Sequence, residues 1–202
     1  TYRWRARGHD GSLAGPWSEW RFMTTSDGSP AGDQSRFSFQ EQKLTDRLEL
    51  KANVANGNLL LKATDLQIRG TGTDLGLERF YNSRSTAAGV FGKGWSMGTG
   101  QDVSLGFSKS DHATADITYR APTGFTATVV NDGAGAWRTP PAIDAKLTRN
   151  TGTGELRLKF DKSEGSFYFA DSTGRLLRSE DKNDNKITFG YDGAGNLTTI
   201  TD

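Results

Sequence analysis

The chain has 202 residues, of which 25 are Lys or Arg and 24 are Asp or Glu, so its formal net charge is +1. This length suggests one or two domains with a buried core, and the even charge balance gives no general attraction for nucleic acid or an anionic membrane. The absence of cysteine excludes disulfides and thiol chemistry, and no apolar run approaches the length of a membrane span. We therefore expect no nucleic-acid partner and no membrane span.

Residues 1–25 predict a β-hairpin. Tyr2 to Arg7 alternates apolar with basic residues, and Pro16 to Thr25 supplies a partner strand after a glycine-rich loop. The pair resembles the last two strands of a fibronectin type III domain. Trp17 and Trp20 could stack against the arginines of the first strand, or they could instead form a surface that contacts a cell-surface glycan.

Residues 26–43 predict a linker, because their start is rich in Gly, Ser and Asp and shows no apolar periodicity. Residues 44–168 predict a β-rich domain of short alternating segments separated by turns. Asn56-Gly57 is the strongest hairpin signal, and the segments 58–62 and 66–68 on its far side are expected to form separate strands. No amphipathic helix of useful length is present.

Residues 169–202 contain one short pattern twice. An aromatic residue precedes Asp, Gly follows three positions after the Asp, and Leu comes two positions later. The pattern describes a strand that ends in a tight turn and restarts, with Asp bonding the turn backbone and Gly taking positive φ. Units of this size stack to bury a shared face. The motif residues are Phe169, Asp171, Gly174 and Leu176 in the first copy and Tyr191, Asp192, Gly195 and Leu197 in the second.

The stretch from Asp181 to Leu197 resembles the Tyr-Asp (YD) repeat of bacterial Rhs proteins. Three upstream segments, 53–59, 79–83 and 91–96, are similar to the region that precedes the first repeats in such proteins. Phe160-Asp161 with Gly165 fits a degenerate earlier copy. Together these motifs cover roughly residues 44 to 202 and occur in the order that the family shows.

The resemblance implies a large secreted protein of the polymorphic toxin type, in which the repeats wind a β-sheet shell around the C-terminal remainder of the same polypeptide, a toxin cargo. It implies an extracellular or cell-wall-associated location. The fold expected is all-β: an antiparallel meander or curved sheet that leads into YD-type β-hairpin repeats, with a partial fibronectin III-like hairpin at the N-terminus. The segment itself would be structural, with no cofactor.

Catalytic and metal-binding alternatives have weak support in the residues. His9 and His112 lie in polar turns without a nucleophile nearby in the sequence, so we expect no catalytic residues. Asp181, Asn183, Asn185 and Asp192 resemble part of a calcium loop, but Lys186 stands where that loop needs Gly, so turn formation is the favoured role and no metal is expected. A glycosidase would need a distinguished acid pair, which the sequence does not show.

A second group of polar residues leaves a further alternative open. Five side chains in the upstream segments favour turn and cap hydrogen bonds, or they could contact a sugar. These are Asn53, Asn56, Asn58, Asp65 and Asn82. The alternative function is therefore an extracellular carbohydrate- or surface-binding module.

Overall fold

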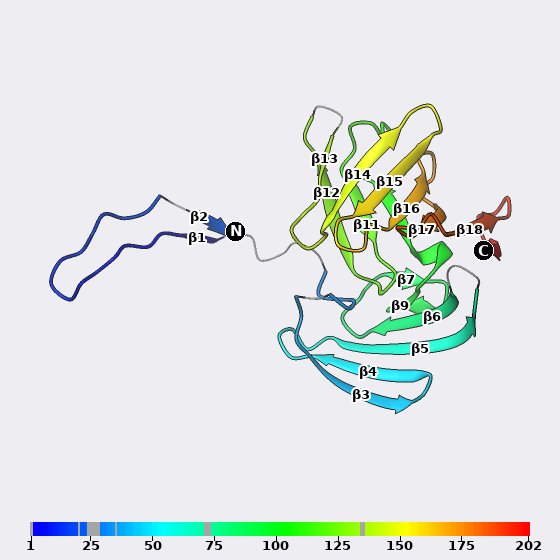
Figure 1. Cartoon of the computed structure of the whole chain (residues 1–202), viewed down its shortest axis with the longest axis horizontal. Helices are drawn as coiled ribbons and strands as arrows, with labels where there is room; N and C mark the ends of the chain where they lie inside the picture. The colour runs from blue at the N-terminus through cyan, green and yellow to red at the C-terminus, as the bar shows by residue number, and fades with distance from the viewer. Residues whose placement is uncertain (1, 20, 24–28, 35, 71–73, 134–135) are drawn as a thin grey trace.

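The computed structural model describes residues 2–19, 21–23, 29–34, 36–70, 74–133 and 136–202 (Figure 1). Within them every regular element is a β-strand except one short 3₁₀ helix, η1 (Gly100–Asp102), and every strand pair is antiparallel. This confirms the prediction of an all-β fold with antiparallel sheets.

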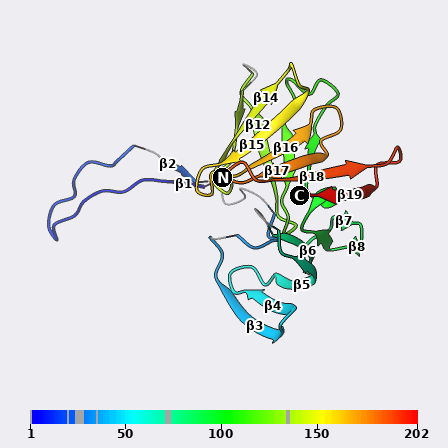
Figure 2. The same ribbon diagram turned by 45° about the vertical axis from the view of Figure 1, so that its right-hand side comes forward.

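The N-terminal hairpin lies apart from the rest of the molecule (Figures 1 and 2). Strand β1 (Tyr2–Trp4) pairs with β2 (Arg21–Met23), and the backbone continues the pairing through a bond from the Ser18 amide to the Ala6 carbonyl. Residues 5–19 are exposed throughout. The fibronectin type III relationship of this hairpin stays a prediction.

The first sheet is a five-stranded meander in the order β3-β4-β5-β6-β9. Its strands are β3 (Phe39–Thr45), β4 (Leu48–Asn53), β5 (Leu59–Ile68), β6 (Leu75–Asn82) and β9 (Trp95–Met97), and a small hairpin of β7 (Ala88–Gly89) and β8 (Gly92–Lys93) is inserted before β9. The segments expected to be separate strands on either side of Asp65 are one strand, β5. A bulge at this position absorbs the break in alternation, and the Asp65 carboxylate pairs with Arg79.

The second and third sheets pack face to face as a sandwich in the upper part of Figure 1. The second sheet contains β10 (Ser104–Phe107), β11 (Ile117–Arg120), β12 (Thr126–Asn131) and β13 (Trp137–Arg138). The third is a meander of β14 (Ala145–Asn150), β15 (Glu155–Phe160), β16 (Ser166–Ala170), β17 (Leu176–Glu180), β18 (Lys186–Tyr191) and β19 (Leu197–Thr201).

The main core lies between these two sheets, because both present alternate residues to the same layer. From the second sheet come Leu105, Ile117, Tyr119 and Val129, and from the third come Leu147, Leu156, Leu158, Phe169 and Leu176, all at most 3% exposed. The side chains between them in sequence, such as Lys146, Thr128 and Lys159, face solvent. The two-residue alternation in the sequence thus corresponds to one solvent-exposed face and one buried face in each of the two sheets.

A buried amide joins the first sheet to the second. Asn82, at the end of β6, is 1% exposed. Its Oδ1 accepts from the Gly32 amide at 2.6 Å and from Asn58 Nδ2 at 2.9 Å, and its Nδ2 donates to the Thr123 carbonyl at 2.9 Å. One side chain therefore connects the segment before β3, the turn before β5 and the turn between β11 and β12.

A buried carboxylate supports the same junction from the other side. Asp102, in η1, is 5% exposed, and its Oδ2 accepts from the amides of Met97 at 2.8 Å and Val90 at 3.2 Å. Arg120 of β11 lies 3.8 Å from its Oδ1 and also donates to the carbonyls of Ala88 and Trp95. The second sheet is thereby fastened to the small hairpin and to β9.

The asparagines singled out in the sequence have structural partners. Asn53, Asn58 and Asn82 are at most 1% exposed, which removes them from any surface that a sugar could touch. Asn53 Oδ1 accepts from the Ala55 and Asn56 amides and so forms the turn before β5, and Asn56 Nδ2 donates to the Pro30 carbonyl. Part of the expected linker packs in the same region, where Ala31 is 1% exposed and β3 begins at Phe39.

We expect Asn82→Ala to lower the free energy of unfolding by about 2–4 kcal/mol, because it leaves two buried donors and a carbonyl without partners. Urea unfolding followed by tryptophan fluorescence measures the change. Asn150→Ala is the matched control, because Asn150 is exposed and bonds only the amides of its own turn, Gly152 and Thr153. Equal losses in the two variants would contradict a junction role for Asn82.

Candidate functional site

The third sheet contains the repeat motif, and its strands recur at a regular interval. The five turns between consecutive strands each hold one residue with positive φ: Gly154, Glu164, Gly174, Asp184 and Gly195. These positions are separated by ten, ten, ten and eleven residues. The structural period is therefore one strand plus one turn, half the 21-residue spacing at which the sequence pattern repeats.

Two successive turns are held by the same clamp of Asp and Asn. Asp181 Oδ1 accepts from the Asn185 amide at 3.0 Å, and Asp181 Oδ2 accepts from Asn185 Nδ2 at 2.8 Å. Eleven residues on, Asp192 makes the same two bonds with Asn196, at 2.8 and 3.0 Å. In both turns the Asp amide also donates to the Asn carbonyl at 3.0 Å. The repeat pattern found in the sequence did not show that these two turns are equivalent. The signal that could have shown it is the recurrence of Asp with Asn four positions later.

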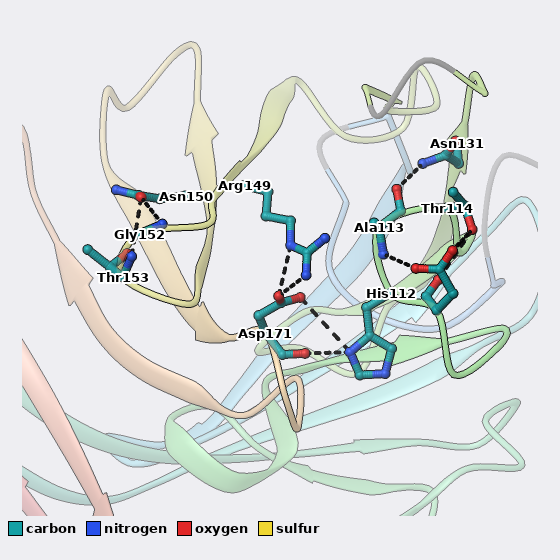
Figure 3. A network of polar contacts seen from close by, with 10 residues as sticks. His112, Ala113, Thr114, Asn131, Arg149, Asn150, Gly152, Thr153 and Asp171 are labelled. Atoms are coloured by element: carbon teal, nitrogen blue, oxygen red, sulfur yellow. Dashed lines mark hydrogen bonds and ion pairs between the residues drawn. The ribbon is translucent and has the colours of Figure 1, made fainter.

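Asp171 occupies the corresponding place in the first copy but has different partners (Figure 3). Its Oδ2 accepts from Arg149 Nε at 2.8 Å and also from Arg149 Nη2, so the turn after β16 is tied to β14, two strands away. Its backbone carbonyl lies 2.6 Å from His112 Nδ1, which must carry the ring proton because a carbonyl can only accept. His112 stacks on Phe107 with ring centres 3.7 Å apart. The histidine is thus a packing and bonding residue, with no nucleophile among its described contacts.

The other motif residues line the packed face of the sheet. Phe169 is fully buried and Leu176 is 2% exposed, while Tyr191 and Leu197 are partly buried against the same core. The Tyr191 hydroxyl donates to the Leu176 carbonyl at 2.7 Å. The paired register of β17 with β18 runs from Glu180 opposite Lys186 to Arg178 opposite Thr188, so this bond satisfies a carbonyl beyond the end of that ladder.

Gly174 and Gly195 hold equivalent turn positions but face different neighbours. A Cβ on Gly174 would collide with the backbone carbonyl oxygen of Leu105, whose amide donates to the Gly174 carbonyl at 2.8 Å. A Cβ on Gly195 would meet the mobile end of the Arg175 side chain. Gly174 therefore allows the repeat sheet to pack against β10, whereas Gly195 is needed only for the conformation of its own turn.

The outer face of the third sheet carries a charged ladder. Arg178 donates to both oxygens of Glu155, at 2.5 and 3.2 Å, and to Glu180 at 2.9 Å, and its guanidinium lies 3.6 Å from the centre of the Tyr168 ring. The hydrogen bond to Glu155 raises the pKa of Arg178 above its ordinary value. Burial by itself would raise the pKa of Glu180, but hydrogen bonds from Tyr168 and Arg178 outweigh it and lower that pKa. These contacts, within β17 and from β17 to β15 and β16, stabilise the outer face without an apolar cover.

The sheet ends in a strand with one free side. Within the described part of the chain, β19 pairs with β18 and with no further strand. The Leu197 amide donates to Gln101 Oε1 at 3.2 Å, which places the start of β19 against η1. Exposure of the core side chains grows toward this edge: Phe169 is 0% exposed, Leu176 2%, Phe189 7% and Ile187 8%. The layer that covers the repeat sheet therefore runs out at its last strands.

The expected surface-binding tryptophans are described only in part. Trp17 is 47% exposed, and the guanidinium groups of Arg5 and Arg7 lie 4.4 and 4.6 Å from its ring centre. Trp20 lies outside the described residues. The tryptophan ring thus takes part in the cation–π ladder that the sequence predicts for this hairpin.

Across the residues that the structure describes, no three His, Cys, Asp or Glu side chains converge in a way that could hold a metal ion. Asp181 and Asp192, two members of the calcium-loop pattern, belong to different turns. The same residues include no helix with the length and apolar character needed to cross a bilayer.

Comparisons with known proteins match two parts of the chain. Residues 52–128 match the family model "Domain of unknown function (DUF6531)", and residues 171–202 match the model "RHS Repeat". The tRNA3(Ser)-specific nuclease WapA of Bacillus spizizenii is 29% identical over 146 residues, and the tRNA nuclease WapA of Bacillus subtilis is 28% identical over 146 residues. Each match covers 72% of this chain but only 6% of the relative. These findings support the prediction of an Rhs/YD-repeat protein.

We expect Gly174→Ala to destabilise the chain by more than about 3 kcal/mol and Gly195→Ala by about 1–2 kcal/mol. Both lose the freedom to adopt positive φ, but only the first creates a clash with backbone that cannot move aside. Urea unfolding of the two variants beside the wild type measures the difference. Similar losses would show that Gly174 is needed only for its turn.

The clamped turns predict a loss of stability in acid. Hydrogen bonds from Asn185 and Asn196 lower the pKa of Asp181 and Asp192 below their ordinary value of 3.8. A lowered folded-state pKa contributes stability that is fully present above 3.8 and is lost as the pH falls through the folded-state value. The urea midpoint should therefore fall below that pH, and it should fall less in the Asp181→Ala/Asp192→Ala double variant. Asp46→Ala, in an exposed turn, should keep the wild-type slope.

Proposed function

We propose that this chain is a non-catalytic structural segment of a large secreted Rhs-type protein and forms the start of a β-sheet shell. The observation that carries the proposal is the third sheet itself, in which six consecutive strands are joined by turns that each hold one residue with positive φ, and which ends at an edge that can accept another strand. A meander of this kind grows by adding similar units at its edge, each hydrogen-bonded through its backbone to the one before.

The packing indicates which part of a shell this segment would form. The apolar face of β14 to β17 packs against the second sheet, which leaves no room there for a cargo the size of a protein domain. The cover becomes incomplete at β18 and β19, where Tyr191, Leu197 and Ile200 are only partly buried. We infer that these residues mark the change from a closed end to an open wall, and that further repeats would continue from β19.

The cargo proposed is a toxin in the C-terminal remainder of the same polypeptide. The relatives are named tRNA nucleases, and the segment they share with this chain is 6% of their length. Such a segment need not contain the nuclease site, and the described residues show neither a metal cluster nor a nucleophile beside His112. We therefore propose that any catalytic activity belongs to another part of the polypeptide.

The location and the first hairpin fit the same picture. A chain with no cysteine can be exported without a requirement for disulfide formation, and we propose an extracellular or cell-wall-associated position. Residues 1–25 would complete a fibronectin type III domain.

The alternative function, carbohydrate or surface binding through Trp17, has less support, because its ring is already engaged by two arginines. A glycan array would detect it as saturable binding that Trp17→Ala abolishes.

The free edge gives the first test. Expressed as this 202-residue chain, the protein should associate as its concentration rises, because β19 exposes unpaired backbone groups. Thr199→Lys places a charge on the exposed side of β19 and should reduce association several-fold in sedimentation velocity. Thr128→Lys is the matched control, because Thr128 is an exposed residue of β12, which has neighbours on both sides. A wild type that stays monomeric at high concentration would contradict an adhesive edge.

The shell itself is tested in the intact polypeptide. A segment enclosed by the repeats should resist protease under native conditions and become sensitive once urea opens the sheets. A downstream segment that is digested equally fast in both conditions would contradict enclosure, whatever the edge does in the shorter chain.

A further inference from the structure

A pocket of about 480 Å³ opens at one end of the sandwich, between the second and third sheets and the segment before β3. Its walls are mainly apolar and aromatic. They include Tyr119, Phe125, Ile143, Phe160 and Phe167. This size and composition are typical of small-molecule sites in proteins.

One wall residue has an unused polar group. Tyr119 is 3% exposed, and its hydroxyl makes no hydrogen bond with the described residues. Four side-chain polar atoms of the described residues are fully enclosed and have no partner: Asn53 Nδ2, Thr99 Oγ1, Arg120 Nε and Asp171 Oδ1. The Tyr119 oxygen is not one of these enclosed atoms. The small accessible part of Tyr119 therefore includes its hydroxyl. Because burial raises the pKa of Tyr119 above its ordinary value, the group stays a neutral donor and acceptor.

The rim of the pocket is acidic. Asp33, Asp144 and Glu180 line it, against a single ammonium group from Lys162. Lys162 is 82% exposed and lies 3.7 Å from Asp144, so it does not close the opening. Asp33 pairs with Lys51 and Glu180 with Arg178, and neither of these cations lines the pocket. A positive charge held above the ring site would be attracted to this rim.

We propose that this pocket binds a phenol ring with a positively charged group close to it. The ring would lie among Phe125, Phe160 and Phe167, and its oxygen would share a hydrogen bond with the Tyr119 hydroxyl. A phenol suits this position because its hydroxyl can donate or accept, whichever Tyr119 requires. The cation would lie at Asp33 and Asp144. The inference is independent of the shell, because it needs only the sandwich.

Two sources could supply this chemistry, a free phenolic amine or a tyrosine beside a lysine in a polypeptide. The probes are tyramine for the first and the blocked tripeptide acetyl-Lys-Tyr-Lys-amide for the second. Phenethylamine, which lacks the hydroxyl, is the matched ligand control. Titration of the ¹⁵N-labelled 202-residue chain, followed by amide chemical shifts, measures each affinity and locates the site.

The decisive experiment compares the affinities of tyramine and phenethylamine for the wild type and for a variant without the Tyr119 hydroxyl. Tyr119→Phe removes only the unpaired hydroxyl, so the fold should be unaffected, and it should weaken tyramine binding about three- to tenfold while leaving phenethylamine unchanged. Tyr191→Phe is the protein control, because that hydroxyl bonds the Leu176 carbonyl outside the pocket. It should change neither affinity.

Each outcome decides the proposal. Saturable binding of tyramine or of the peptide, with shifts around Phe125 and Phe167 and the expected loss in Tyr119→Phe, supports it and identifies the source. An absence of saturable binding for both probes would overturn the site. Binding that Tyr119→Phe leaves unchanged, or that weakens equally for phenethylamine, would overturn the assigned hydrogen bond and with it the phenol specificity.

Discussion

The apolar face of the repeat sheet is stable in water only where another layer covers it. A single β-hairpin buries too little surface to persist alone, so each unit depends on its neighbours and on the sheet opposite. Here the second sheet supplies that cover, and its central residues Ile117 and Val129 are fully buried against the repeats. The rest of the architecture follows from this contact: the first sheet lies to one side of it, and the last hairpin extends beyond it.

Polar contacts rather than apolar packing set how the first sheet meets the sandwich. Asn82 and Asp102 are both buried, and each bonds several backbone groups from different segments. An apolar interface tolerates small sliding movements, whereas a satisfied buried amide or carboxylate accepts one arrangement, because any other leaves a polar group without a partner. We infer that these two side chains fix the angle at which the repeats start, which a shell that grows by repetition would then propagate.

Much of the fold could be predicted from the sequence because its information is local. Two-residue alternation located the strands, and Asn-Gly or Asp-x-x-Gly located several turns, such as the one at Asn56 and Gly57. The partners of Asn82 could not be predicted, since they lie 24, 41 and 50 residues away. The turn at Asp184 was not recognised as equivalent to its neighbours because a non-glycine residue adopts its positive φ, which hides the true period. The pocket at Tyr119 is lined by five segments that are far apart in the sequence, so no local pattern predicts it.

The two copies of the motif show what such a repeat encodes. Asp171 and Asp192 hold the same place in the pattern, yet the first bonds Arg149 on a distant strand and the second bonds only its own turn. Gly174 and Gly195 differ in the same way, since the first touches β10 and the second touches a side chain of its own sheet. The motif therefore specifies how the chain reverses, and the neighbouring layer determines what else each residue does. Where the second layer is incomplete, as at β19, the turn still reverses the chain and positions one more strand.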